Sequence, residues 1–163
     1  DNFSAFLTAS PAVGSWHPQL TVGVQKQWAK IEHNGETLQM DTPLFFCTLN
    51  NGIQLPYHWT LSTDINFQSK GDYQNIYMYQ NVFMMNATLT KSFLNEHLSI
   101  HLQGIDLTHG RKDGNRIYNK HMNMDVANVS DSRELRFTIR YKFNTAKSKY
   151  KGKGAATEEI KRL

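Results

Sequence analysis

The sequence contains no long apolar run. None approaches the roughly 18 consecutive apolar residues of a transmembrane helix, and the mean hydropathy is −0.56, which excludes helical membrane spans. Cysteine is nearly absent, because Cys47 is the only one in 163 residues. An internal disulfide is therefore excluded, and the cysteine content does not indicate in which cellular compartment the protein lies. No signal peptide opens the sequence, and residues 2–10 already alternate as a strand does. We therefore expect this chain to be part of a longer protein.

The sequence has no basic surface outside its C-terminal tail. The net charge is +4, and the six basic and two acidic side chains of residues 144–163 account for all of it. Residues 1–143 are neutral overall and show no basic face with interleaved stacking aromatics, which excludes nucleic acid as a partner. Alternating lysines in the tail are typical of a flexible solvated segment.

Strict alternation is what the sequence does have, and it is clearest over residues 133–143. The odd positions are all apolar or aromatic: Leu135, Phe137, Ile139, Tyr141 and Phe143. The even positions are polar and mostly charged, which indicates a β-strand with one apolar and one polar face. A tilted strand crosses a bilayer in about 9–11 residues. The strand ends in the aromatic pair Tyr141 and Phe143, at the position where an outer-membrane strand carries its interfacial aromatic residues.

The same alternation predicts six more strands. Together the seven expected strands cover residues 2–10, 16–30, 44–51, 57–70, 76–93, 98–107 and 133–143. Short connections at 11–14, 52–56 and 94–96 alternate with longer polar ones at 33–43, 70–75 and 108–132. Short turns at one end and long loops at the other are typical of an up-and-down barrel in the outer membrane. We predict an all-β fold of antiparallel transmembrane barrel strands, about seven in number and part of a larger barrel, over residues 1–143. Residues 144–163 would form a periplasmic tail.

Two sets of side chains are the candidate functional residues. Aromatic residues bracket the aliphatic bands, as in the two interfacial belts of a membrane barrel. The predicted interface aromatics are Trp16, Trp28, Trp59, Phe67, Tyr77, Tyr79, Phe93, Tyr141 and Phe143. On the opposite faces lie the candidate lumen-lining residues Asp64, Asn66, Gln68, Asn86, Thr88, His101, Gln103, Arg136 and Arg140. In a soluble barrel the polar set would instead be the solvent face.

Several short motifs stand out: Lys91-Ser92-Phe93 before a tight turn, Gly104-Ile105-Asp106, Asn51-Gly52 through Pro56 with Trp59, Gln68 to Gly71, Arg140 to Asn144 and Lys149 to Gly152. Together they resemble an outer-membrane β-barrel family of the Bacteroidetes whose members look like TonB-dependent receptors. The resemblance covers most of the chain and implies the carboxy-terminal strands of a nutrient receptor or transporter in the cell outer membrane. It also implies partners: outer-membrane lipid, upstream barrel strands and a plug, and the TonB system through the full-length protein.

No residue pattern points to catalysis or to a cofactor. His97 and His101 are four apart, which on a strand separates them by roughly 13 Å, so no metal site is expected. Asp64 and Asp106 are single carboxylates on different strands, and no nucleophile elbow or P-loop occurs. We expect no enzymatic activity and no cofactor. Two alternatives stay open: a soluble lipid-binding barrel or sandwich with the apolar rows inside, and an outer-membrane barrel enzyme.

Overall fold

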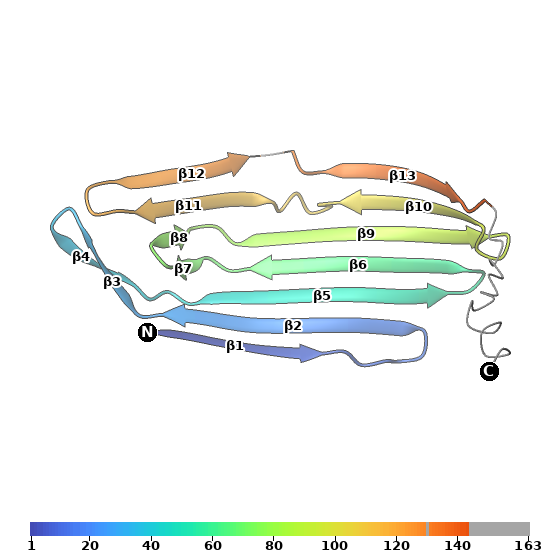
Figure 1. Cartoon of the computed structure of the whole chain (residues 1–163), viewed down its shortest axis with the longest axis horizontal. Helices are drawn as coiled ribbons and strands as arrows, with labels where there is room; N and C mark the ends of the chain where they lie inside the picture. Colours follow the sequence, from blue (N-terminus) through green and yellow to red (C-terminus); the bar gives the residue numbers. More distant parts are fainter. Residues whose placement is uncertain (130, 144–163) are drawn as a thin grey trace, which may run out of the picture.

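The computed structural model describes residues 1–129 and 131–143, whose regular structure is entirely β-strand. The main sheet is antiparallel and has seven strands in the order β1-β2-β5-β6-β9-β10-β13. Their bounds are β1 (Asn2–Ala9), β2 (Trp16–Gln27), β5 (Leu44–Leu55), β6 (Trp59–Gln68), β9 (Val82–Phe93), β10 (Leu98–Ile105) and β13 (Glu134–Tyr141). Each strand lies beside the next one along the chain that belongs to this sheet (Figure 1), which confirms the predicted up-and-down arrangement. No helix of the described residues is long and apolar enough to span a membrane.

The connections at one end of the main sheet, on the right in Figure 1, are short. Tyr57 and His58 turn the chain from β5 into β6 with φ angles of 60° and 61°. Residues 94–97 form the tight turn from β9 to β10, as the sequence predicts. The predicted connection at 52–56 is misplaced, because β5 continues to Leu55 through full pairing with β6.

The longer connections at the opposite end contain strands of their own. A hairpin consists of β3 (Ala29–His33) and β4 (Glu36–Met40). A four-stranded extension, in the order β12-β11-β8-β7, consists of β7 (Gly71–Tyr73), β8 (Ile76–Met78), β11 (Lys112–Tyr118) and β12 (Asn123–Val129). The predicted loops at 33–43, 70–75 and 108–132 are therefore wrong in large part, since the described residues there pair as strands.

Two predicted strands are each divided in the structure. Residues 79–81 separate β8 from β9, and Trp28 separates β2 from β3. The chain changes partner across each break: β8, before the first break, pairs with β7 and β11 instead of with the main sheet, and β3, after the second, pairs with β4. Alternation continues across the break at residues 79–81 in the sequence, so period alone gave no sign of that change.

Buried side chains gather where the hairpin and the extension leave the main sheet. Met40 and Leu44 are 2% and 1% exposed and are the buried hydrophobic residues of the described chain. The backbone N–H of Thr42 donates to the Asp72 carboxylate at 2.8 Å, and the Gln27 amide makes two 2.7 Å hydrogen bonds with the Gln74 backbone. This junction fixes the direction in which both outer segments leave the sheet.

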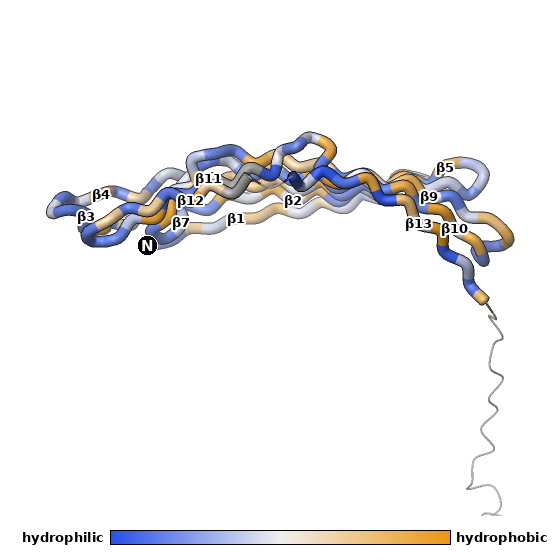
Figure 2. The backbone as a smooth tube through the Cα atoms, turned by 90° about the horizontal axis from the view of Figure 1, so that it is seen from above, coloured by the Kyte–Doolittle hydropathy of each residue, from blue (hydrophilic) through white to orange (hydrophobic). Residues whose placement is uncertain are grey.

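The molecule is a single curved layer, seen edge-on in Figure 2. Among the described residues, β1 pairs only with β2 and β13 only with β10, so the main sheet is open at both edges. The tips of the two outer segments touch: the Asn34 N–H donates to the Lys120 carbonyl at 2.8 Å, and Lys120 lies 3.3 Å from Glu32. These contacts join the layer at its long-loop end.

Candidate functional site

The strand register places most apolar side chains of the seven strands on one face. Paired residues of neighbouring strands project to the same side of a sheet. Leu49 pairs with Leu20 on one side and with Ile65 on the other, and Ile65 pairs in turn with Met85. We call this side the apolar face; its larger members are Phe3, Leu7, Leu20, Val22, Val24, Phe45, Leu49, Ile53, Leu61, Ile65, Phe67, Phe83, Met85, Leu89, Leu98, Ile100, Leu102, Leu135, Phe137 and Ile139.

The apolar face is not enclosed by the rest of the described chain. Leu20 is 38% exposed, Phe137 62% and Ile139 60%. Leu61 and Ile65, nearer the middle of the sheet, are half-buried by their neighbours along it. A soluble lipid-binding barrel needs these rows packed together as its interior, and they are not. An uncovered apolar surface of this extent marks contact with lipid or with another protein.

Four of the predicted interface aromatics lie in one row at the short-turn end of the apolar face. Trp16 begins β2, Trp59 begins β6, Phe93 ends β9 and Tyr141 ends β13. Register connects the last three, because Lys91 pairs with Trp59 while Leu98 pairs with both Phe93 and Tyr141. Just beyond β13, the Phe143 ring stands edge-on to Tyr141, with centroids 4.7 Å apart. These aromatic side chains lie together at this end of the sheet, and their role at a membrane interface stays a prediction.

The polar groups of this belt have hydrogen-bond or cation–π partners close by. The Trp16 indole N–H donates to the Asn51 side-chain oxygen at 3.2 Å. The Lys91 ammonium lies 5.2 Å from the Trp59 ring and 5.3 Å from the Phe93 ring, and it also donates to the Tyr57 carbonyl. A lysine held over aromatic faces at the border of an apolar surface matches the behaviour of long cationic side chains at a membrane interface.

The opposite end of the apolar face carries only part of the predicted second belt. Phe67 pairs with Phe83 there, and Trp28 stands 52% exposed with the Lys26 ammonium 5.2 Å from its ring. Tyr77 belongs to β8 of the extension, and Tyr79 follows it in the break before β9. The prediction that the two tyrosines share one strand with Phe83 is wrong, because the chain changes sheet between them.

All nine predicted lumen-lining residues lie on the other side of the main sheet, which we call the polar face. Thr88 pairs with Gln103, and Gln103 with Arg136, so they form one row across three strands. Hydrogen bonds cross the strands as well: the Thr48 hydroxyl donates to the Asn66 amide oxygen at 3.1 Å, and His101 lies 3.0 Å from the Thr90 hydroxyl. Asp64 is exposed between Asn50 and Asn86, and Arg140 pairs with Ser99.

An aromatic pair on the polar face, Phe6 with Phe46, was not predicted from the sequence. The Phe6 ring covers Gly23 of the neighbouring strand, where an added Cβ would lie only 2.4 Å from a Phe6 ring carbon. Phe6 also contacts Phe46, with ring centroids 6.4 Å apart. An aromatic side chain over a strand glycine stabilises the pair and shields the exposed backbone. The sequence feature that could have indicated this contact is Gly23, a glycine inside an otherwise regular strand.

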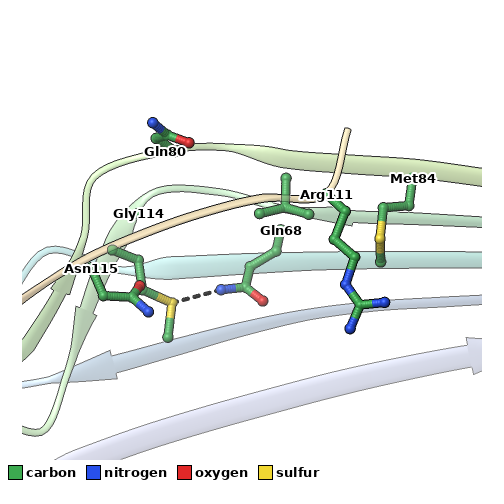
Figure 3. A pocket seen from close by; sticks show the side chains of 8 residues that line it. Gln68, Gln80, Met84, Arg111, Gly114 and Asn115 are labelled. Atoms are coloured by element: carbon green, nitrogen blue, oxygen red, sulfur yellow. Dashed lines mark hydrogen bonds between the residues drawn. The ribbon is translucent and has the colours of Figure 1, made fainter. Parts of the chain in front are cut away.

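A hollow lies on the polar face beneath the extension. Its volume is about 470 Å³, and Gln68, Met78, Gln80, Val82, Met84, Arg111, Gly114 and Asn115 line it. Figure 3 shows Gln68 between Asn115 on one side and Arg111 on the other, with Met84 beside the arginine and Gln80 turned away from them. The Gln68 amide donates to the Met78 sulfur at 2.6 Å. Sequence reasoning found Gln68 but missed Arg111, because it placed residues 108–132 in one long loop.

Asp106 ties the main sheet to the extension. It is 2% exposed and accepts hydrogen bonds from the backbone N–H of Gly110 at 2.8 Å, from that of Arg111 at 3.3 Å and from the Ser132 hydroxyl. Burial alone would raise the pKa of Asp106, but the hydrogen bonds from Ser132 and the loop outweigh it, and the pKa is lowered from 3.8. Its position shows a structural role at the end of β10.

The histidines highlighted in the sequence do not come together. The His97 ring binds the Leu94 carbonyl within its own turn at 2.8 Å, and His101 lies between the hydroxyls of Thr90 and Ser99, each at 3.0 Å. Within residues 1–129 and 131–143, no group of three or more His, Cys, Asp or Glu side chains could hold a metal ion.

Comparison with known families agrees with this two-faced geometry. The profile of the outer membrane protein beta-barrel family matches residues 2–141, which include all seven strands of the main sheet. The chain belongs to the outer membrane protein beta-barrel family. No curated protein and no solved structure matches it. In an outer membrane beta-barrel the strands turn an apolar band outward and their polar side chains inward. The structure shows that alternation in every strand of the main sheet.

Proposed function

We propose that this protein forms part of the wall of an outer-membrane receptor that takes up a nutrient, in the manner of the TonB-dependent receptors it resembles. One observation supports the proposal most: the register turns the apolar set of all seven strands to one uncovered face and the hydrogen-bonded polar set to the other. The apolar face would contact lipid in the outer membrane, and the polar face would line the lumen or contact a plug.

The open edges of the main sheet supply the partners in this proposal. Each edge of β1 and β13 that has no partner strand presents backbone N–H and C=O groups. In hydrocarbon each such group without a hydrogen bond costs several kcal/mol, so an open sheet does not persist in a bilayer. Further strands of the full-length protein would therefore pair with both edges and close the barrel. A plug within the lumen and the TonB system would complete the receptor.

The named residues have supporting and lining roles in this proposal, and none has a catalytic role. Trp16, Trp59, Phe93 and Tyr141 would anchor the short-turn end at the periplasmic interface. Asp64, Gln103 and Arg136 would line the lumen, where they contact water, a solute or the plug. We propose a transport protein instead of an enzyme because the polar face presents rows of polar side chains that hydrogen-bond to one another across the strands.

Membrane location and energised uptake test the proposal together. Cells with and without the full-length protein are fractionated, and retention of radiolabelled oligosaccharides, cobalamin and a ferric chelate is measured. We expect the protein in the outer-membrane fraction, and uptake of one solute class that is lost both on deletion and on dissipation of the proton-motive force. Recovery in a soluble fraction would contradict the barrel role. Uptake unaffected by dissipation would contradict the TonB-linked part alone.

A further inference from the structure

We propose that the polar-face hollow binds a solute that carries a carboxylate beside hydroxyl groups, such as an acidic oligosaccharide. Arg111 would bind the carboxylate, and Gln68 and Asn115 the hydroxyl groups. This inference rests on the proposed function, because the hollow is open to solutes only if the polar face is the lumen side. It goes further by naming the chemistry of the ligand and the residues that recognise it.

The hollow has the size and continuity of an oligosaccharide site. It encloses about 470 Å³, and a neighbouring hollow of about 250 Å³ shares Gln68, Val82 and Met84 with it. Sites for small ligands usually measure about 300–1,000 Å³. The second hollow adds Phe46, whose ring faces the polar side and rests against Phe6. An aromatic face of this kind packs against the C–H surface of a sugar ring.

The lack of an acidic partner among the described residues distinguishes Arg111 from Arg116 and Lys120. Arg116 binds Asp125 at 2.6 Å, and Lys120 lies 3.3 Å from Glu32. The guanidinium of Arg111 has no acidic partner among the described residues, and the residue is exposed. Its backbone is fixed by the N–H bond to Asp106, so the side chain starts from a defined position. A guanidinium presents a rigid fork of donors that matches both oxygens of a carboxylate.

The amides beside Arg111 have capacity for a ligand. The Gln68 N–H donates to the Met78 thioether, which is a weak acceptor that a hydroxyl oxygen would replace. Asn115 lines the same hollow from β11, on the far side of Gln68 (Figure 3). A side-chain amide both donates and accepts, as a sugar hydroxyl does, so the two groups are complementary. A cation with two such amides on one side of it therefore favours a polyhydroxylated acid over a purely apolar anion.

Binding measurements on the protein purified from outer membranes in detergent test this inference. The probes are trigalacturonate, its neutral counterpart galactotriose and the acidic peptide triglutamate. We expect trigalacturonate to bind at least tenfold more tightly than either of the others, with an affinity that falls as salt is raised. Arg111→Gln should weaken trigalacturonate binding roughly ten- to hundredfold, since a hydrogen bond to a charged group is lost. Arg111→Lys should weaken it less, and Lys120→Gln, the matched control, should leave it unchanged.

Three outcomes would overturn the inference: equal affinity for galactotriose, unchanged affinity in Arg111→Gln, or tighter binding of triglutamate. Absence of trigalacturonate binding by protein that is correctly assembled, as judged by its heat-modifiable migration, would also overturn it while the proposed function stands. Failure of the unmodified protein to reach the outer membrane would instead overturn the proposed function. The two failures are therefore separable in one preparation.

Discussion

An arginine scan along β13 tests which side of the sheet contacts lipid. Leu135, Phe137 and Ile139 project from the apolar face and are 75%, 62% and 60% exposed, while Thr138 projects from the polar face opposite His101. Tyr141 ends the strand in the short-turn belt. Replacement of each apolar residue by arginine, with Thr138→Arg as the control, places the same charge on the two faces of one strand.

The expected loss of stability for each arginine depends on how deep the replaced residue lies in the membrane. A strand rises about 3.4 Å per residue and tilts by about 35–45°, so two residues correspond to roughly 5 Å of depth. Ile139 is then about 5 Å below the belt at Tyr141, and Phe137 about 10 Å, near the middle of an apolar band about 25 Å tall. Arginine at a midplane position costs about 2–4 kcal/mol and near the interface about 0–1 kcal/mol. We expect the penalty to rise from Ile139→Arg to Phe137→Arg, while Thr138→Arg stays below about 1 kcal/mol.

Urea titration of the variants in liposomes, with the yield of membrane-assembled protein as a second readout, measures these penalties. A difference of about 2 kcal/mol between Phe137→Arg and Thr138→Arg corresponds to roughly a thirtyfold change in the folding equilibrium. Equal penalties at Thr138 and Phe137 would refute the assignment of faces. A penalty that is larger at Ile139 than at Phe137 would refute the depth order derived from the register.

Three further predictions concern single contacts. Gly23→Val should destabilise the protein by about 1–3 kcal/mol, because the valine side chain would collide with the Phe6 ring. Adding Phe6→Ala should relieve most of that penalty in the double variant, and denaturant titration measures both effects. Because the pKa of Asp106 is lowered in the folded protein, its contribution to stability is present above about pH 4 and is lost as the pH falls through the folded-state pKa. Asp106→Asn should therefore reduce the loss of stability at acidic pH. An unchanged pH dependence of stability in this variant would contradict the role of Asp106. Lys91→Leu should weaken anchoring at the short-turn end, seen as a red shift of Trp59 fluorescence in liposomes, and an unchanged spectrum would argue against the cation–π contact.

The sequence predicted the main sheet well because period-two alternation is a direct consequence of one wet and one apolar side. Residues 133–143 illustrate this: their alternation gave the strand, its facing and the aromatic end, and β13 has all three. The candidate lumen residues are on the polar face for the same reason. What alternation predicts is the side of a strand to which each residue points.

Partner choice was not predictable in the same way. Residues 76–93 alternate almost throughout, yet the chain enters the main sheet only after residues 79–81, and β8 before them pairs with β11. Alternation describes one strand at a time, whereas the change of sheet depends on contacts distant in sequence, such as the tie between Asn75 and the Tyr118 carbonyl at 2.9 Å. The hollow on the polar face was missed for this reason, since Arg111 reaches it only through the extension.

The claim that one face of the main sheet contacts lipid and the other contacts water is tested most directly by probing consecutive side chains along β13 in the native membrane. Nitroxide labels at positions 135 to 140, introduced singly after Cys47→Ser, report collision with oxygen, which partitions into lipid, and with a polar nickel chelate, which stays in water. We expect alternation with period two, with oxygen contact highest at Leu135, Phe137 and Ile139 and chelate contact highest at Arg136, Thr138 and Arg140. Uniform values along the strand, or an apolar row protected from both reagents as in a closed soluble core, would contradict it.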